Sequence, residues 1–189
     1  MQKRVFIIIA VVIICFSVWL GWRLFENSQS FAQQVVEVVE RGDWSTLYQL
    51  VHPLEKKQLG LTEEKVRWLG ENLIRPLWKT LGPIKQIRLM KFPDEHPFMP
   101  SPGEERYFAG SRFFMLLREG QSKGVILAVT PTSEGKRLDF TFFLYTLIVE
   151  AEMRGKVNKA RAIAVLRQLG IHSIFVDGAF IPLTLLSSS

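Results

Sequence analysis

The chain has 189 residues, of which 24 are basic and 18 acidic, and its formal net charge is +6. Three basic residues and no acidic residue precede position 26, so the remainder carries 21 basic and 18 acidic side chains. This excess is small and evenly spread, which argues against nucleic acid as a partner. The single cysteine, Cys15, excludes an intramolecular disulfide, and the rest of the sequence has no thiolate for catalysis or metal binding.

The N-terminal residues predict a membrane anchor. Residues 5–22 include no charged side chain, and as a helix they would extend about 27 Å, close to the thickness of the hydrocarbon layer. Lys3 and Arg4 precede this segment. We therefore expect a cytoplasmic tail over residues 1–4, a single-pass signal-anchor helix over residues 5–25 and an extracytoplasmic domain after it, in the cell membrane. The side chains expected to contact lipid or its surface are Val5, Ile9, Ile13, Trp19 and Trp22.

Two alternatives exist for this segment. A cleaved signal peptide needs small residues at its cleavage site, and Ser28 and Ser30 offer a poor version of that pattern behind the bulky residues 19–25. A lipoprotein would be anchored through Cys15, but Ile14 stands where a small residue is usual. We favour the retained helix.

The next part of the chain has the periodicity of helices. Apolar residues recur at helical spacing over residues 31–39, with glutamine and glutamate between them. Gly42 ends this helix, and Asp43 is placed to cap a short helix over residues 44–52. Pro53 is expected to stop that helix.

A further helix is predicted after Thr62, whose hydroxyl suits a cap. An apolar stripe runs through residues 66–77. Pro76 falls inside the stripe, which predicts a kink or a restart of the helix there. Gly82 and Pro83 end the helical half of the domain.

The sequence then changes to the pattern of strands. A proline-rich loop over residues 94–105 follows the first strand. Short polar turns at residues 119–123 and 131–136 join the later strands, so an antiparallel meander is expected. In the last predicted strand both faces are apolar, which indicates a sheet covered on both sides or a face that meets a partner. The predicted strands are residues 84–92, 107–118, 124–130 and 138–149.

The C-terminal residues predict a helix and a hairpin. Asn158 is placed to cap a helix over residues 159–169. Residues 171–183 contain two short apolar runs on either side of Asp177 and Gly178, a pair that suits a two-residue hairpin turn. The predicted fold class is therefore α+β: an N-terminal transmembrane helix, a domain of helices packed on a curved antiparallel sheet, and a C-terminal helix-hairpin extension.

Three short motifs accompany this order of elements: Arg41-Gly42-Asp43-Trp44, Leu50-Val51-His52-Pro53 and Leu81-Gly82-Pro83-Ile84. With helices first and a curved sheet afterwards, they resemble the nuclear transport factor two-like superfamily over roughly residues 31–149. The resemblance implies a cone-like domain over residues 26–149, and residues 150–189 depart from the family as an extension. A short tail, one span and an exterior cone are also similar to the layout of scaffold subunits of type IV secretion systems.

Candidate site residues follow from that resemblance. Enzymes of the superfamily place an Asp or His deep in the cone as a general base, and Asp139 is the matching residue on the predicted sheet. Its position at the start of a strand is more typical of a surface turn. His52, directly ahead of a proline at a helix end, is more typical of a capping or packed imidazole. A ligand cavity, if present, would be lined by Phe113, Phe140 and Phe142.

The sequence lacks the usual motifs of catalysis. His96 with Asp94 and Glu95 is a weak set of metal ligands, and a solvated loop is the favoured interpretation. No phosphate-binding loop, paired-histidine zinc motif or serine nucleophile elbow is present. We therefore expect no catalytic residue, no metal and no cofactor.

Two functional hypotheses follow. The first is a membrane-anchored binding or assembly module without catalytic activity, with the lipid bilayer and other membrane or envelope proteins, or a second copy of the chain, as partners. The alternative is a small-molecule-binding cone, with or without isomerase-like or hydrolytic activity. A cone filled solidly by its phenylalanine side chains would count against the alternative.

Overall fold

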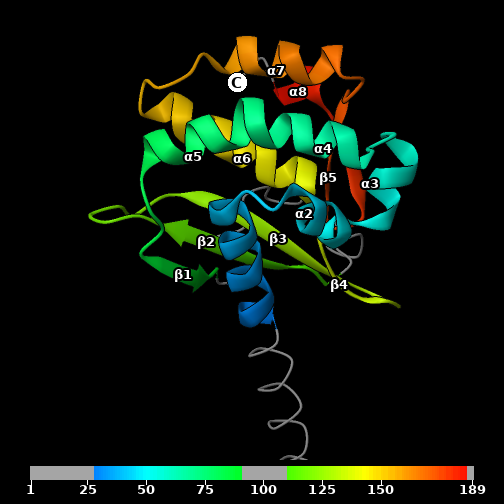
Figure 1. Ribbon diagram of the computed structural model, residues 1–189, viewed down its shortest axis with the longest axis horizontal. Coiled ribbons are helices and arrows are strands. Elements are labelled where there is room, and N and C mark those ends of the chain that lie inside the picture. The colour runs from blue at the N-terminus through cyan, green and yellow to red at the C-terminus, as the bar shows by residue number, and fades with distance from the viewer. Residues whose placement is uncertain (1–27, 91–109, 187–189) are drawn as a thin grey trace, which may run out of the picture.

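The structure is a computed structural model that describes residues 28–90 and 110–186. A helix over residues 28–41 crosses in front of a curved antiparallel sheet, and further helices lie above it (Figure 1). Its buried side chains include Ala32, Val35 and Val39, which confirms the predicted amphipathic stripe. The following helices are α2 (Trp44–Leu50), α3 (Pro53–Gln58), α4 (Glu63–Leu69), a π-helical turn (Gly70–Ile74) and α5 (Arg75–Leu81).

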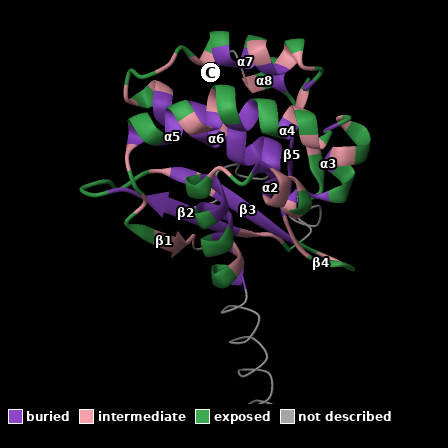
Figure 2. Cartoon of the chain, in the orientation of Figure 1, coloured by how far each residue is buried: buried purple, intermediate pink, exposed green. Residues whose placement is uncertain are grey.

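Among the described residues the sheet has four strands in the order β1-β2-β3-β4, all antiparallel. Its two interior strands are mostly buried (Figure 2). The predicted antiparallel meander is confirmed for its first three strands, whereas the fourth strand begins within the segment expected to be the turn after β3. The strands are β1 (Gln86–Leu89), β2 (Arg112–Leu117), β3 (Val125–Thr132) and β4 (Gly135–Leu138).

The strand expected over residues 138–149 is wrong. Only its first residue, Leu138, is in a strand, and the chain then forms the helix α6 (Phe140–Met153). Ten of the 14 residues of α6 are buried, so the helix is apolar all round and shows no helical stripe. Its phenylalanine, threonine and isoleucine residues also favour strands intrinsically, and tertiary packing overrides that preference.

Helix α6 continues along the edge of β3 beyond the point where β4 ends. The amide of Asp139 donates to the carbonyl of Ala128 (3.1 Å), as a further strand residue would. Beyond it the hydroxyl of Thr146 accepts from the amide of Ile126 (3.2 Å) and lies 2.9 Å from the carbonyl oxygen of the same residue. One hydroxyl thus satisfies the backbone groups that a missing strand would have paired.

A π-helical turn accommodates Pro76 in this helix. Proline in a helix removes one donor and its ring clashes with the preceding turn. Here the wider turn at Gly70–Ile74 comes directly before it, and Pro76 lies in the first turn of α5, so the ordinary helical pattern is interrupted where the proline has no amide to donate. The predicted restart at Pro76 is confirmed.

Trp44 locks α2 against this turn. A Cβ placed on Gly70 would lie 2.3 Å from the indole ring, so only glycine allows the ring so close. The indole nitrogen donates to Glu71 (2.6 Å), and Arg75 donates to the other oxygen of the same carboxylate (2.6 Å). This is the structural role of the segment around Gly42 and Trp44.

The C-terminal extension packs on the rest of the domain. Asn158 caps α7 through its side chain, as predicted, and the hairpin turns at Asp177 and Gly178, both with positive φ, the geometry of a type I′ turn. These elements lie around α6, with α7 and α8 above it in Figure 1. They are α7 (Lys159–Gln168), β5 (Ser173–Val176), β6 (Ala179–Pro182) and α8 (Leu183–Leu186).

The expected fold is corrected in its first element. Within residues 28–90 and 110–186, no helix combines the length and the apolar character needed to cross a bilayer. The anchor expected over residues 5–25, with its signal-anchor and single-pass character, lies outside these ranges. The fold that is described is an α+β domain without a membrane-spanning helix.

Candidate functional site

Two of the sequence candidates, Asp139 and His52, lie at the buried start of α6. Asp139 occupies the N-cap position, yet its side chain makes no capping hydrogen bond. The cap comes instead from Glu55 on α3, whose two carboxylate oxygens accept from the amides of Phe140 (2.7 Å) and Thr141 (2.8 Å). A carboxylate is favourable there because the first amides of a helix lack partners and carry partial positive charge. We call this cluster the α6 junction.

The hydroxyl of Thr141 connects the cap to the C-terminal hairpin. It donates to Glu55 (2.5 Å) and accepts from the amide of Phe175 on β5 (2.8 Å). Glu55 therefore receives three hydrogen bonds and is completely buried. With these three hydrogen bonds, the buried oxygens of Glu55 have their hydrogen-bonding partners within the protein itself.

Asp139 forms a second branch of the junction. One of its oxygens accepts from the hydroxyl of Thr130 on β3 (2.8 Å), and the other from the amide of Asp177 (2.8 Å). The carboxylate of Asp177 in turn accepts from the amide of Ser111 (2.8 Å). These bonds join β3, the start of α6 and the hairpin turn, and they account for the burial of both aspartates.

His52 closes the other side of the junction. Its Nδ1 accepts from the amide of Leu54 (3.2 Å), which makes it the N-cap of α3. Its ring lies against Phe175, with centroids 4.6 Å apart. Burial and the nearby charge of Arg137 lower the pKa of His52, which favours the neutral imidazole that this capping bond requires. Pro53 therefore begins α3, where the sequence predicted the end of a helix.

Burial changes the titration of the two carboxylates. It raises the pKa of Glu55 to about 8, with the charge of Asp139 acting in the same direction and the hydrogen bonds from Thr141 and Phe140 opposing it. It raises the pKa of Asp139 to about 7, against the hydrogen bonds from Asp177 and Thr130. Raised carboxyl pKa values are a property of many catalytic acids. In this cluster, however, every oxygen is engaged with the chain.

The three phenylalanine candidates pack within the core. Phe140 and Phe142 are completely buried, and the ring of Phe113 meets that of Phe142 edge to face with centroids 6.0 Å apart. Their role is packing of α6 on the sheet.

We searched the described residues for clusters of metal-ligating side chains. Residues 28–90 and 110–186 contain no group of three or more metal-ligating side chains. The loop residues His96, Asp94 and Glu95 lie outside those ranges.

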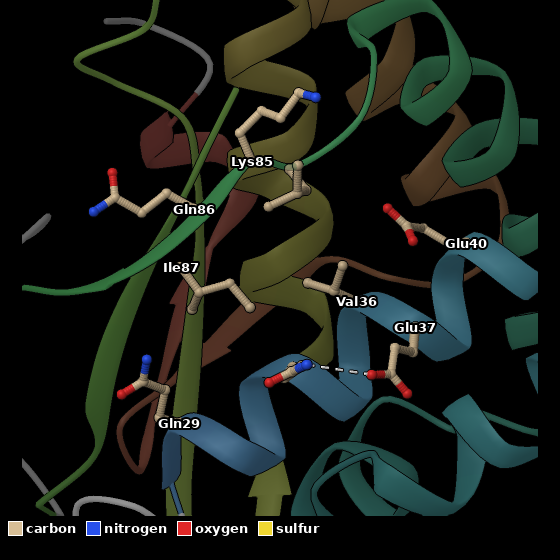
Figure 3. Close-up of a pocket in the computed structure, with 9 residues that line it drawn as sticks. Gln29, Val36, Glu37, Glu40, Lys85, Gln86 and Ile87 are labelled. Carbon is tan, nitrogen blue, oxygen red and sulfur yellow. Dashed lines mark hydrogen bonds between the residues drawn. The ribbon is translucent and has the colours of Figure 1, made fainter. Parts of the chain in front are cut away.

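An open groove lies between helix 28–41 and β1 (Figure 3). Its volume is about 340 Å³. Ile87 and Val36 face each other across it, while Glu37 and Glu40 extend from the helix and Lys85 from the strand side. The residues that line this β1 groove are Gln29, Gln33, Val36, Glu37, Glu40, Ile84, Lys85, Gln86 and Ile87.

The β1 groove has an acidic wall. Gln33 donates to Glu37 through a long 3.5 Å hydrogen bond, and Glu40 makes no ion pair with any residue that the structure describes. With one lysine against two glutamates, the groove carries a net negative charge. Val36, Ile84 and Ile87 are its apolar side chains, and the rest of its lining is polar or charged, so it offers apolar contact and charge to a ligand.

Sequence reasoning found part of the α6 junction and none of the β1 groove. Glu55 was missed because it lies 85 residues from the amide that it caps. The one available signal was an acidic residue in the first turn after Pro53, and that is also ordinary helix chemistry. The groove combines two segments, residues 29–40 and 84–87, whose proximity no local pattern reveals.

Comparison with family models, with curated proteins and with solved structures found no match. The resemblance to the nuclear transport factor two-like superfamily therefore stays a prediction.

Proposed function

We propose that this domain is a binding or assembly module without catalytic activity, and that the β1 groove is its binding surface. The observation that carries the proposal is the groove itself: an open, acidic cleft of about 340 Å³ beside β1, which is an edge strand among the described residues. Clefts with an apolar floor and a few charged groups are the usual place for a ligand.

The α6 junction supports a non-catalytic interpretation. An acid or base must reach a substrate proton, within about 3 Å or through one water. Glu55 and Asp139 are instead bonded on both oxygens to amides and hydroxyls of the chain, and both are 0% exposed. The packed rings of Phe113 and Phe142 count against the alternative of a ligand-filled cone.

Photo-crosslinking tests the proposal. A photoreactive residue placed at Gln33 or Gln86, on the two walls of the groove, should give a discrete adduct with a partner in the native cell. The same residue at the exposed Glu64 on α4 should give none. Replacing Glu37 and Glu40 by lysine should abolish the groove adducts. Equal adducts at all three positions, or none at the groove, would refute it.

A further inference from the structure

The β1 groove lies beside a sheet edge that is open in the described part of the chain. β1 is the first strand in the sheet order, and no described strand pairs with its outer side. The amide of Met90 donates to Phe113 on β2 (2.8 Å). Backbone groups alternate along a strand, so the amides of Ile87 and Leu89 point away from β2.

A strand beside β1 would extend over the groove. Its alternate side chains would fall on the face where Ile87 and Val36 meet, within reach of Glu37 and Glu40. Strand addition at an exposed edge obtains its affinity from main-chain hydrogen bonds and its specificity from pockets for alternate residues. The outer edge of β1 provides the main-chain hydrogen bonds, and the β1 groove provides the pocket for alternate side chains.

Charge identifies the kind of segment. The groove-facing residues of an incoming strand meet two carboxylates, of which Glu40 has no ion-pair partner among the described residues. Basic side chains complement them. A second copy of β1 is a poorer fit, because its two basic residues, Lys85 and Arg88, are three positions apart and so lie on opposite faces of the strand, which leaves only one of them for the groove.

We infer that the β1 groove binds an extended polypeptide segment with basic residues at alternate positions, which pairs with the outer edge of β1 as a fifth strand. This inference rests on the proposed function, because it names the ligand class of the same groove. It adds a backbone requirement that groove binding alone does not have.

The test uses the full chain and a fluorescein-labelled nonapeptide of alternating lysine and valine, followed by fluorescence anisotropy at low and moderate salt. An alternating glutamate–valine peptide should bind at least about tenfold more weakly. Two further lysine–valine peptides carry N-methyl groups on every second amide, one in each phase. One of these should lose about tenfold in affinity and the other should bind like the parent, because only one set of amides faces β1.

Protein variants locate the site. The double substitution Glu37→Gln with Glu40→Gln should weaken the lysine–valine peptide about fivefold and flatten its salt dependence, whereas Glu64→Gln on α4 should change neither. Ile87→Pro removes an outward amide without removing a bond to β2 and should abolish binding. Circular dichroism verifies that each variant is folded. If Ile87→Pro does not fold, the N-methylated peptides alone test whether the ligand pairs with β1.

Each other outcome overturns the inference. Equal binding of both N-methylated peptides would exclude strand pairing while leaving groove binding, and the crosslinks at Gln33 and Gln86, intact. Equal binding of the glutamate peptide would exclude the basic ligand. Concentration-dependent self-association that Ile87→Pro abolishes would assign the edge to a second copy. Absence of any peptide binding would reject the segment as ligand, and the crosslinks would then test the groove alone.

Discussion

The two sides of the sheet satisfy their backbone in different ways. Where β4 ends, the chain itself covers the exposed part of β3: α6 runs along it, and the hydroxyl of Thr146 bonds to both backbone groups of Ile126. On the opposite side, β1 ends the sheet within the described ranges and a groove of about 340 Å³ lies beside it. On the covered side a distant helix bonds to the strand backbone, whereas on the open side no strand among the described residues pairs with β1.

This difference separates stability from binding. Side chains at the covered side are buried and bonded to backbone groups, so their removal leaves unpaired polar groups. The charged side chains of the β1 groove, Glu37, Glu40 and Lys85, are exposed, so their removal costs the fold little. Substitutions at the covered side should therefore change stability, whereas substitutions in the β1 groove should change binding.

The largest effect is expected at the cap of α6. Glu55→Ala leaves the amides of Phe140 and Thr141 without an acceptor inside the core, and should lower the free energy of unfolding by about 3 kcal/mol. Urea denaturation followed by circular dichroism measures it. Glu64→Ala, an exposed glutamate in the first turn of α4, is the matched control and should cost less than about 0.5 kcal/mol. Equal losses would show that Glu55 is not a cap.

A pH series sharpens the same point. The pKa of Glu55 is raised from 4.5 to about 8 on folding, so the folded state holds a proton that the unfolded chain releases. The contribution of Glu55 to the free energy of unfolding is therefore complete below pH 4.5. This contribution is lost as the pH rises toward 8, and the loss amounts to about 2 kcal/mol between pH 5 and 7. Asp139, raised to about 7, acts in the same direction, and the lowered pKa of His52 opposes both.

The isosteric Glu55→Gln variant separates these contributions. It cannot titrate at position 55, so its stability should decline less steeply between pH 5 and 7 than that of the parent chain. A parallel decline in the two proteins would mean that Glu55 does not titrate in this range, and would leave Asp139 as the group responsible.

A smaller effect is expected at the covered edge. Thr146→Val keeps the shape of the side chain but leaves the amide and the carbonyl of Ile126 unpaired, at a cost of about 1.5 kcal/mol. Thr80→Val is the control, because the hydroxyl of Thr80 is exposed and bonds only to the carbonyl of Pro76 in its own helix. Hydrogen exchange of the Ile126 amide should accelerate in the first variant alone.

The smallest effect on stability is expected in the groove. Glu40→Gln should change the free energy of unfolding by less than about 0.5 kcal/mol, because the carboxylate forms no ion pair with a described residue. Thermal unfolding at constant pH measures this. A loss as large as that of Thr146→Val would place Glu40 in the fold and remove the distinction between the two sides.

Local chemistry was readable from the sequence. The caps at Asp43, Thr62 and Asn158 were predicted correctly, and each is a side chain that bonds an amide within a few residues. The hairpin at Asp177 followed from a two-residue turn. The strand assigned to residues 138–149 failed because α6 is buried all round, which removes the periodicity that distinguishes a helix from a strand.

Tertiary chemistry was less readable. Asp139 and His52 were recognised as candidates, but their partners Glu55 and Thr141 depend on contacts between α3, α6 and the hairpin. The β1 groove depends on how helix 28–41 crosses the sheet. Such sites arise from the packing of distant segments, and residue type and spacing alone do not specify them.

The π-helical turn at Gly70–Ile74 has a consequence for how this chain tolerates length changes. Deleting one residue there would rotate all that follows by about 100° about the helix axis. Trp78 and Leu81, both buried, would then turn out of the core, and the ring of Pro76 would meet an ordinary helical turn. The single residue that widens this turn therefore determines which face of α5 points into the core. Insertions and deletions there should destabilise the fold more than substitutions do.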